Sequence, residues 1–134
     1  GGIRVPGIFC WPEKLAPGKS DAVICATDIL PTIAALTQIP LFADWKIEGQ
    51  NIWPALSGPN FIAERRLYWR TPRQLALRQG DWKLVHHGAT PETGADELFD
   101  LKTDPLEQID LAAQQPEKLA ELKHALIQEW ARDN

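Results

Sequence analysis

Apolar residues are arranged differently in the two parts of this chain. Residues 3–11 form an almost continuous run that is rich in β-branched and aromatic side chains. Such a run predicts a short strand that is buried on both faces. Further along, Thr27 or Asp28 can cap a helix that ends before Pro40, with Pro31 tolerated in its first turn. The apolar positions of this helix follow helical spacing and comprise Ile29, Leu30, Ile33 and Leu36.

The second part alternates between apolar and polar residues before it takes up a helical period. Residues 67–69 and 97–101 predict strands, and two runs around Gly80-Asp81 predict a β-hairpin over residues 74–87. From Pro116 onward the spacing predicts an amphipathic helix that covers one face of a small antiparallel sheet. The side chains expected to meet there are Trp82, Leu84 and Leu98 on the sheet and Leu119, Leu122 and Leu126 on the helix.

Composition narrows the possible partners. The 134 residues are 44% hydrophobic and 24% charged, which is sufficient for one domain with a buried core. A net charge of -4 gives no general attraction to nucleic acid or to an anionic membrane. The apolar runs are much shorter than the roughly 20 residues of a membrane span. Cys10 and Cys25 lack CxxC spacing, so we expect buried thiols rather than a zinc site, and their pairing stays open.

Three residues are candidates for ligand binding. His86 and His87 stand where a predicted strand enters a loop, and a histidine can donate to an anionic oxygen, although a solvated strand end is the alternative. Only one of the two is expected to face a given pocket, because neighbouring strand residues point to opposite faces. Arg4 suits a sulfate or carboxylate, with an internal salt bridge or backbone contact as the alternative. Four acidic residues could suggest a cation site, but they lack the order of an EF-hand loop, and a solvated, helix-capping role is expected for them: Asp100, Asp104, Glu107 and Asp110.

Five short motifs follow one another along almost the whole chain. They are Gly1-Gly2-Ile3-Arg4-Val5-Pro6, Asp28-Ile29-Leu30-Pro31-Thr32, Glu48-Gly49 with Leu56-Ser57-Gly58, Arg78-Gln79-Gly80-Asp81-Trp82-Lys83-Leu84, and Glu97-Leu98-Phe99-Asp100-Leu101 followed by Asp104-Pro105-Leu106-Glu107. Each motif is weak alone. In this order they resemble the C-terminal part of formylglycine-dependent sulfatases, the arylsulfatase family of the alkaline-phosphatase-like superfamily.

The resemblance implies a fold and a division into domains. Residues 1–58 would be the terminal strand and helix of the large α/β catalytic domain of a sulfatase. Residues 59–134 would be its small C-terminal subdomain, a four-stranded antiparallel sheet packed on the last helix. The whole chain would then be an α+β fragment of an α/β enzyme.

The resemblance also implies what the chemistry of the parent protein is. Sulfatases of this family hydrolyse sulfate esters with a formylglycine nucleophile and a divalent cation, calcium. Neither Cys10 nor Cys25 is followed by x-Pro-Ser-Arg, the motif that yields formylglycine, and the family's metal ligands would precede Gly1. We therefore expect no catalytic residue, metal ligand or bound cofactor in this chain. Its expected role is to complete the core and shape the substrate entrance, with His86, His87 and Arg4 as candidate contacts.

Other interpretations stay open. A related phosphonate or phosphate ester hydrolase would share this scaffold, and a stand-alone interaction module could dock through a free strand edge and apolar surface. The expected partners are the missing N-terminal catalytic part of the same protein and a sulfate-ester substrate, and the fragment itself is expected to self-associate. By resemblance the compartment would be periplasmic, extracellular or lysosomal, and the sequence does not choose among these.

Overall fold

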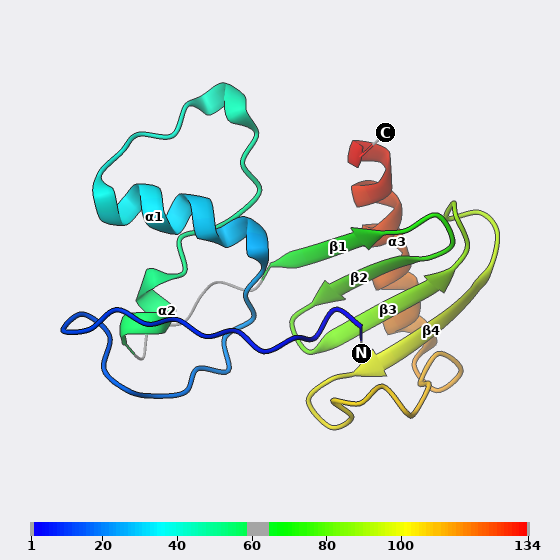
Figure 1. The fold of residues 1–134 in the computed structure, drawn as a ribbon. Helices are drawn as coiled ribbons and strands as arrows, with labels where there is room; N and C mark the ends of the chain where they lie inside the picture. The colour runs from blue at the N-terminus through cyan, green and yellow to red at the C-terminus, as the bar shows by residue number, and fades with distance from the viewer. Residues whose placement is uncertain (1, 59–64, 134) are drawn as a thin grey trace. The chain divides into compact units, whose positions relative to one another are not determined.

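The computed structural model describes residues 2–58 and 65–133 and divides the chain into two compact units. One unit is Val5–Ala63, and the other joins Gly1–Arg4 to Glu64–Asn134. The elements, labelled as in Figure 1, are α1 (Ile29–Thr37), α2 (Trp53–Ser57), β1 (Arg66–Arg70), β2 (Leu75–Gln79), β3 (Trp82–His87), β4 (Ala95–Asp100) and α3 (Pro116–Asp133), with short 3-10 turns at Ala26–Asp28 and Ala43–Trp45.

The later unit is an antiparallel sheet backed by one helix. Its strands lie in the order β1-β2-β3-β4, and α3 packs across β2 and β3 (Figure 1). This confirms the predicted α+β arrangement of a small antiparallel sheet and a terminal helix. Gly80 has a φ of 59° in the two-residue turn between β2 and β3, a left-handed backbone that glycine adopts without steric cost.

The core of this unit forms between the sheet and α3. Leu77, Leu84 and Leu98 are direct cross-strand partners, so they lie in one row on the face that α3 covers. Trp82 and Leu119 pack against the edge of this core, as the sequence predicts. The buried residues of the core are Leu75, Leu77, Leu84, Leu98, Leu122, Ala125 and Leu126.

In the earlier unit, α1 forms where the sequence predicts it but buries a different face. Its buried residues are Pro31, Thr32 and Ala34, while the expected apolar positions Ile29 and Ile33 are 40% and 52% exposed. Polar contacts set this orientation. The hydroxyl of Thr32 accepts a hydrogen bond from the backbone N–H of Ile52 at 3.0 Å, which draws the segment before α2 onto this side of the helix.

The buried strand predicted for residues 3–11 is wrong. The backbone from Arg4 to Trp11 belongs to no strand, and every side chain along it is exposed, with Val5 at 77% and Ile8 at 92%. A strand is buried on both faces only when it has neighbours in a sheet. Within the described residues, the strands all lie between Arg66 and Asp100 and pair with one another instead.

Asp28 joins the start of α1 to the segment that leads into α2. Its side chain is fully buried and accepts hydrogen bonds from the backbone N–H groups of Cys25 at 2.7 Å and Gln50 at 2.9 Å. Gly49 makes this approach possible, because a Cβ there would lie 2.0 Å from the carbonyl oxygen of Thr27. The Asp28–Thr32 and Glu48-Gly49 motifs are therefore accounted for by backbone contacts inside this unit.

Replacing Gly49 with alanine should therefore destabilise the Val5–Ala63 unit. The added Cβ would collide with backbone rather than with a flexible side chain, so the segment would have to move away and loosen the Asp28 hydrogen bonds. Strain of this kind costs on the order of 1–3 kcal/mol. Thermal unfolding followed by circular dichroism should show a lower midpoint than for Gly18→Ala, where the nearest atom is 3.9 Å away. Equal midpoints for the two variants would contradict this explanation of Gly49.

Candidate functional site

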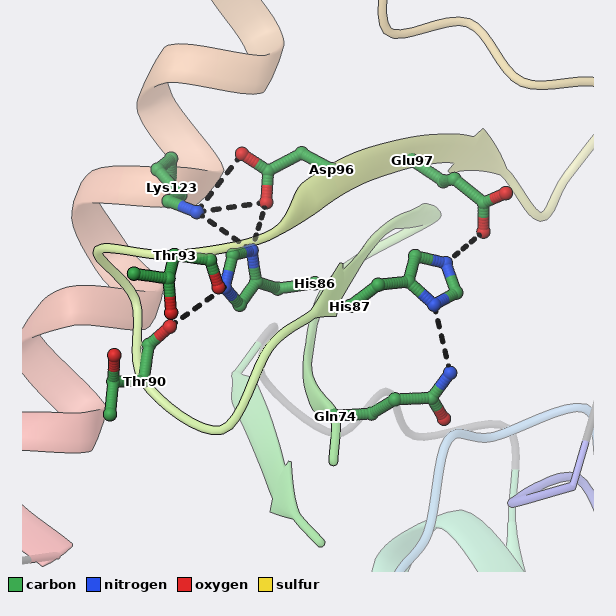
Figure 2. A network of polar contacts seen from close by, with 8 residues as sticks. All are labelled: Gln74, His86, His87, Thr90, Thr93, Asp96, Glu97 and Lys123. Carbon is green, nitrogen blue, oxygen red and sulfur yellow. Dashed lines mark hydrogen bonds and ion pairs between the residues drawn. The ribbon is translucent and has the colours of Figure 1, made fainter. Parts of the chain in front are cut away.

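The two candidate histidines lie side by side at the end of β3 but face different surroundings. The residue His86 is 1% exposed, whereas the side chain of His87 is 40% exposed. Figure 2 shows the two rings in separate polar networks, as alternation along a strand requires. Only one of the two therefore reaches solvent.

Every polar position of the His86 ring is engaged inside the protein. Nε2 lies 2.8 Å from the carbonyl oxygen of Thr90 and 3.0 Å from that of Thr93 (Figure 2). Since both partners can only accept, Nε2 carries the hydrogen that they share. Nδ1 lies 2.6 Å from Oδ1 of Asp96 and 2.9 Å from Nζ of Lys123, which also binds both oxygens of that carboxylate.

The loop between β3 and β4 closes tightly over His86. A Cβ at Gly88 would lie 1.8 Å from the carbonyl oxygen of Thr93, and one at Gly94 would lie 2.2 Å from that of His87. Gly94 also has a φ of 135°, in the range that glycine tolerates best. The two glycines thus let the loop return close enough for Thr93 to reach the His86 ring, which makes His86 the residue that positions the loop.

His87 lies in a second, more open network. Its Nδ1 lies 2.9 Å from Nε2 of Gln74, and its Nε2 lies 2.7 Å from Oε2 of Glu97 (Figure 2). The ring borders an open depression on the surface of the sheet-and-helix unit. The depression is lined by Thr71, Pro72, Arg73, Gln74 and His87.

Arg4, the third candidate, contacts the backbone. Its Nη1 donates a hydrogen bond to the carbonyl oxygen of Pro105 at 2.8 Å, and the side chain lies at an exposed position. Backbone contact was one of the alternatives for this residue. The bond ties the Gly1–Arg4 segment to the loop that follows β4.

The carboxylates of Asp100, Asp104 and Asp110 accept hydrogen bonds from strand and loop backbone, and in the described structure no helix lies between β4 and α3 for them to cap, so the helix-capping role expected for them is wrong. Oδ2 of Asp104 accepts from the N–H groups of Gln108 at 2.6 Å and Ile109 at 2.8 Å. Asp110 accepts from Leu98 N–H and Ala112 N–H at 2.9 Å each, and Asp100 accepts from Lys102 N–H at 3.0 Å. In the part of the chain that the structure describes, no three His, Cys, Asp or Glu side chains are grouped as a metal ion would require.

Glu107 has a different role from the other acidic residues. Its Oε2 lies 2.5 Å from Nζ of Lys83, and the side chains are 11% and 6% exposed. Burial raises the pKa of Glu107, but the hydrogen bond and the charge of Lys83 act in the opposite direction, and the pKa lies below its ordinary value. The pair links two of the sequence motifs, the Trp82-Lys83-Leu84 strand and the Asp104–Glu107 turn.

Cys10 and Cys25 are free thiols, and Cys10 is exposed because residues 3–11 are uncovered, so its predicted burial is wrong. None of the helices in residues 2–58 and 65–133 combines the length and apolar character needed to cross a membrane.

Sequence reasoning did not single out Asp96 and Lys123 as partners of His86. Asp96 lies directly opposite His86 in the β3–β4 register. A correct prediction of the length of the β3–β4 loop would have set this register and so identified Asp96 as a partner of His86. Lys123 lies 37 residues away on α3, and only the packing of the helix on the sheet brings it to the ring.

Comparison with known proteins accounts for the order of the motifs. No family model matches the chain. It is 31% identical over 137 residues to an N-acetylgalactosamine-6-O-sulfatase of Bacteroides thetaiotaomicron, covering 93% of this chain and 27% of that protein. It is 30% identical over 151 residues to human arylsulfatase A, covering 92% of this chain and 30% of that protein.

The fold agrees with these sequence matches. A structure solved in a study of glycosaminoglycan metabolism by Bacteroides thetaiotaomicron superposes with a TM-score of 0.74 and 27% identity, covering 92% of this chain and 28% of that one. The chain thus spans 27% and 30% of the length of the two curated relatives described above. From its motifs, fold and relatives, the chain belongs to the sulfatase family, as a segment that corresponds to the C-terminal part of those proteins.

Proposed function

We propose that this chain is the C-terminal part of an enzyme that hydrolyses sulfate esters. In this proposal the chain completes the core of the enzyme and forms part of the wall of the substrate entrance, and it has no catalytic centre of its own. The observation that carries the proposal is the large apolar surface that residues 5–45 leave uncovered.

This apolar surface lies mainly on one unit. Among the described residues, ten large apolar side chains of the Val5–Ala63 unit are exposed, against four in the other unit, whose sheet and α3 bury a core of their own. Exposed apolar area of this extent marks an interface. The exposed side chains are Val5, Ile8, Phe9, Trp11, Ile29, Leu30, Ile33, Ile39, Phe42 and Trp45.

The proposed cover for this surface is the rest of the sulfatase polypeptide. Residues 5–11 belong to no helix or strand, and within the described structure none of their backbone N–H groups donates a hydrogen bond. An apolar segment of this kind can enter a sheet as a strand between two further strands, which would satisfy its backbone and bury both faces. The curated relatives have more than two thirds of their length outside the matched segment, enough to supply those strands.

The proposed substrate is a sulfate ester carried on a sugar. The bacterial relative is named for the 6-O-sulfate of N-acetylgalactosamine, which supports this class. Of the three candidate contacts, His87 is the one we propose for the entrance, because its ring borders an open depression on the surface. We propose that His86 and Arg4 do not contact the substrate themselves. Instead, His86 holds the β3–β4 loop in place and Arg4 holds the loop around Pro105.

We propose that the formylglycine and the calcium ion of the parent enzyme lie in its N-terminal part. Sulfate ester hydrolysis in this family needs a nucleophile that attacks sulfur, a cation that binds the sulfate oxygens, and an acid that protonates the departing alcohol. Cys10 precedes Trp11 and Cys25 precedes Ala26, so neither lies in the sequence that yields formylglycine.

The chain alone should therefore show no turnover of a chromogenic aryl sulfate and no tight binding of calcium. The expected result follows from the residues required, because the nucleophile and the cation ligands would both be supplied by other parts of the polypeptide. The measurements are a continuous absorbance assay and isothermal titration calorimetry with calcium chloride. Turnover above a no-protein blank, or stoichiometric calcium binding, would mean that the chain contains catalytic groups and would overturn this division of roles.

A further inference from the structure

The depression beside His87 is built mainly by the turn that joins β1 to β2. The N–H of Thr71 donates to the carbonyl oxygen of Gln74 at 2.8 Å. The hydroxyl oxygen of Thr71 accepts from the N–H groups of Gln74 at 2.9 Å and Arg73 at 3.3 Å. Thr71 therefore fixes the backbone of the turn, and the side chain of Arg73 is not needed for that purpose.

Arg73 differs from the neighbouring arginines because its guanidinium has no hydrogen-bond partner among the described residues. Arg66, Arg70 and Arg78 each donate to a side chain or a carbonyl of their own unit. No hydrogen bond or ion pair joins the side chain of Arg73 to any residue that the structure describes, and the residue is exposed. A guanidinium carries five N–H donors in a planar fork, which match the oxygens of a carboxylate or a sulfate.

Gln74 adds an acceptor to the same depression. Its Nε2 faces Nδ1 of His87, so its amide donates there, and His87 donates from Nε2 to Glu97. Figure 2 shows the amide oxygen of Gln74 turned away from the His87 ring. Among the described residues nothing donates to that oxygen, which leaves it available to a hydroxyl group.

The charge of the lining favours an anion. Arg73 is the charged residue among those that line the depression, and Glu97 lies on the other side of the His87 ring from Gln74 (Figure 2). The Glu97 carboxylate is also engaged by its hydrogen bond from His87. The depression thus contains the guanidinium of Arg73 and the amide oxygen of Gln74, neither of which has a hydrogen-bond partner among the described residues. The ring of Pro72 is its apolar part.

We propose that this depression binds an oxyanion carried on a polyhydroxylated ring, such as a sulfated sugar or a uronic acid. Arg73 would bind the anionic group and Oε1 of Gln74 would accept a hydrogen bond from a neighbouring hydroxyl. The proposal deepens the proposed function, on which it rests for placing this face beside the substrate entrance. The binding step itself needs none of the catalytic groups, so it can be measured on the 134-residue chain.

The test is a ¹H–¹⁵N NMR titration of the chain with four probes: galactose 6-sulfate, galacturonic acid, galactose and sodium sulfate. The Nε signal of Arg73 and the side-chain amide signals of Gln74 should shift saturably with the two anionic sugars. Neutral galactose lacks the ion pair, and sodium sulfate lacks the hydroxyl contact. Loss of a hydrogen bond to a charged group should weaken the binding of galactose about tenfold or more.

Matched variants distinguish binding at this site from nonspecific attraction of the anion to any exposed arginine. Arg73→Ala should lower the affinity for the anionic sugars about tenfold or more, because it removes the ion pair. Arg132→Ala removes an exposed arginine of α3 that pairs with Glu129, and should leave the affinity unchanged. The spectrum of each variant reports whether its fold is intact, because the signals of α3 and the sheet should keep their positions.

The relative affinities decide the outcome. Tighter binding of the sulfated sugar assigns the anion to sulfate, tighter binding of the uronic acid assigns it to carboxylate, and either result supports the proposal. Equal affinity of the Arg73→Ala chain, equal affinity of inorganic sulfate, or no saturable shift with either anionic sugar would overturn it. Those results would leave the core-completing role untouched, since that role is tested by the activity, calcium and exchange measurements.

Discussion

Truncating Leu122 to alanine should lower the free energy of unfolding of the sheet-and-helix unit by about 2 to 5 kcal/mol. Leu122 is 1% exposed and lies in the core that α3 forms with Leu84 and Leu98. The shortened side chain would lose its burial and leave a cavity that a packed core cannot fill completely. Denaturant titration followed by tryptophan fluorescence and circular dichroism measures this loss.

Ile127→Ala is the matched control on the same helix. Ile127 is 43% exposed and lies outside the core, so its truncation should cost much less. The helix propensity of the two variants changes in the same direction, since both replace a large aliphatic residue with alanine. A loss for Leu122→Ala no greater than that of the control would contradict the packing of α3 on the sheet.

Replacing Glu107 with glutamine should cost about 3 to 5 kcal/mol, because it leaves the ammonium of Lys83 buried without its carboxylate. Lys83 is 4% exposed, so water cannot take over the role of the missing charge. The control is Glu121→Gln on α3, which breaks an exposed pair with Lys118 and should change stability by roughly 0 to 1 kcal/mol. Chemical unfolding at pH 7 measures both variants.

The same pair predicts how stability depends on acidity. The pKa of Glu107 is lower in the folded protein than its ordinary value, so the charged carboxylate stabilises the fold at neutral pH. That stability is present above the unfolded pKa of about 4.3 and is lost as the pH falls through the lower, folded value. The Glu107→Gln chain should therefore lose less stability over this acidic range than the unaltered chain, and equal losses would contradict the ion pair.

The sequence predicts elements well where the determinants are local. The hairpin around Gly80 depends on alternation and one turn, and α3 depends on a helical stripe that begins at Pro116, so neighbouring residues are sufficient for both. The exposure of residues 3–11 could not be predicted in the same way. Their apolar character indicates burial, but burial also requires partner strands, which are not properties of the segment itself.

The candidate site also depends partly on local features of the sequence and partly on contacts between remote segments. Residue type and position pointed to His86 and His87, but their different environments depend on the return of the β3–β4 loop and on Lys123, which is distant in sequence. The orientation of α1 depends in a similar way on Thr32, whose hydroxyl binds a segment twenty residues further along. In each case a polar contact between remote segments decides which side chains are buried, and periodicity does not contain that information.

Hydrogen exchange of the chain, measured by mass spectrometry, tests most directly the claim that the apolar surface of residues 5–45 is built to be covered by another part of the protein. The core strands and α3 should be strongly protected, whereas peptides from residues 5–11 should exchange as fast as an unfolded chain at low protein concentration. Protection of residues 5–11 should appear only as the concentration rises and a second copy covers them. Protection of residues 5–11 as strong as that of α3 in a dilute, monomeric sample would contradict the account.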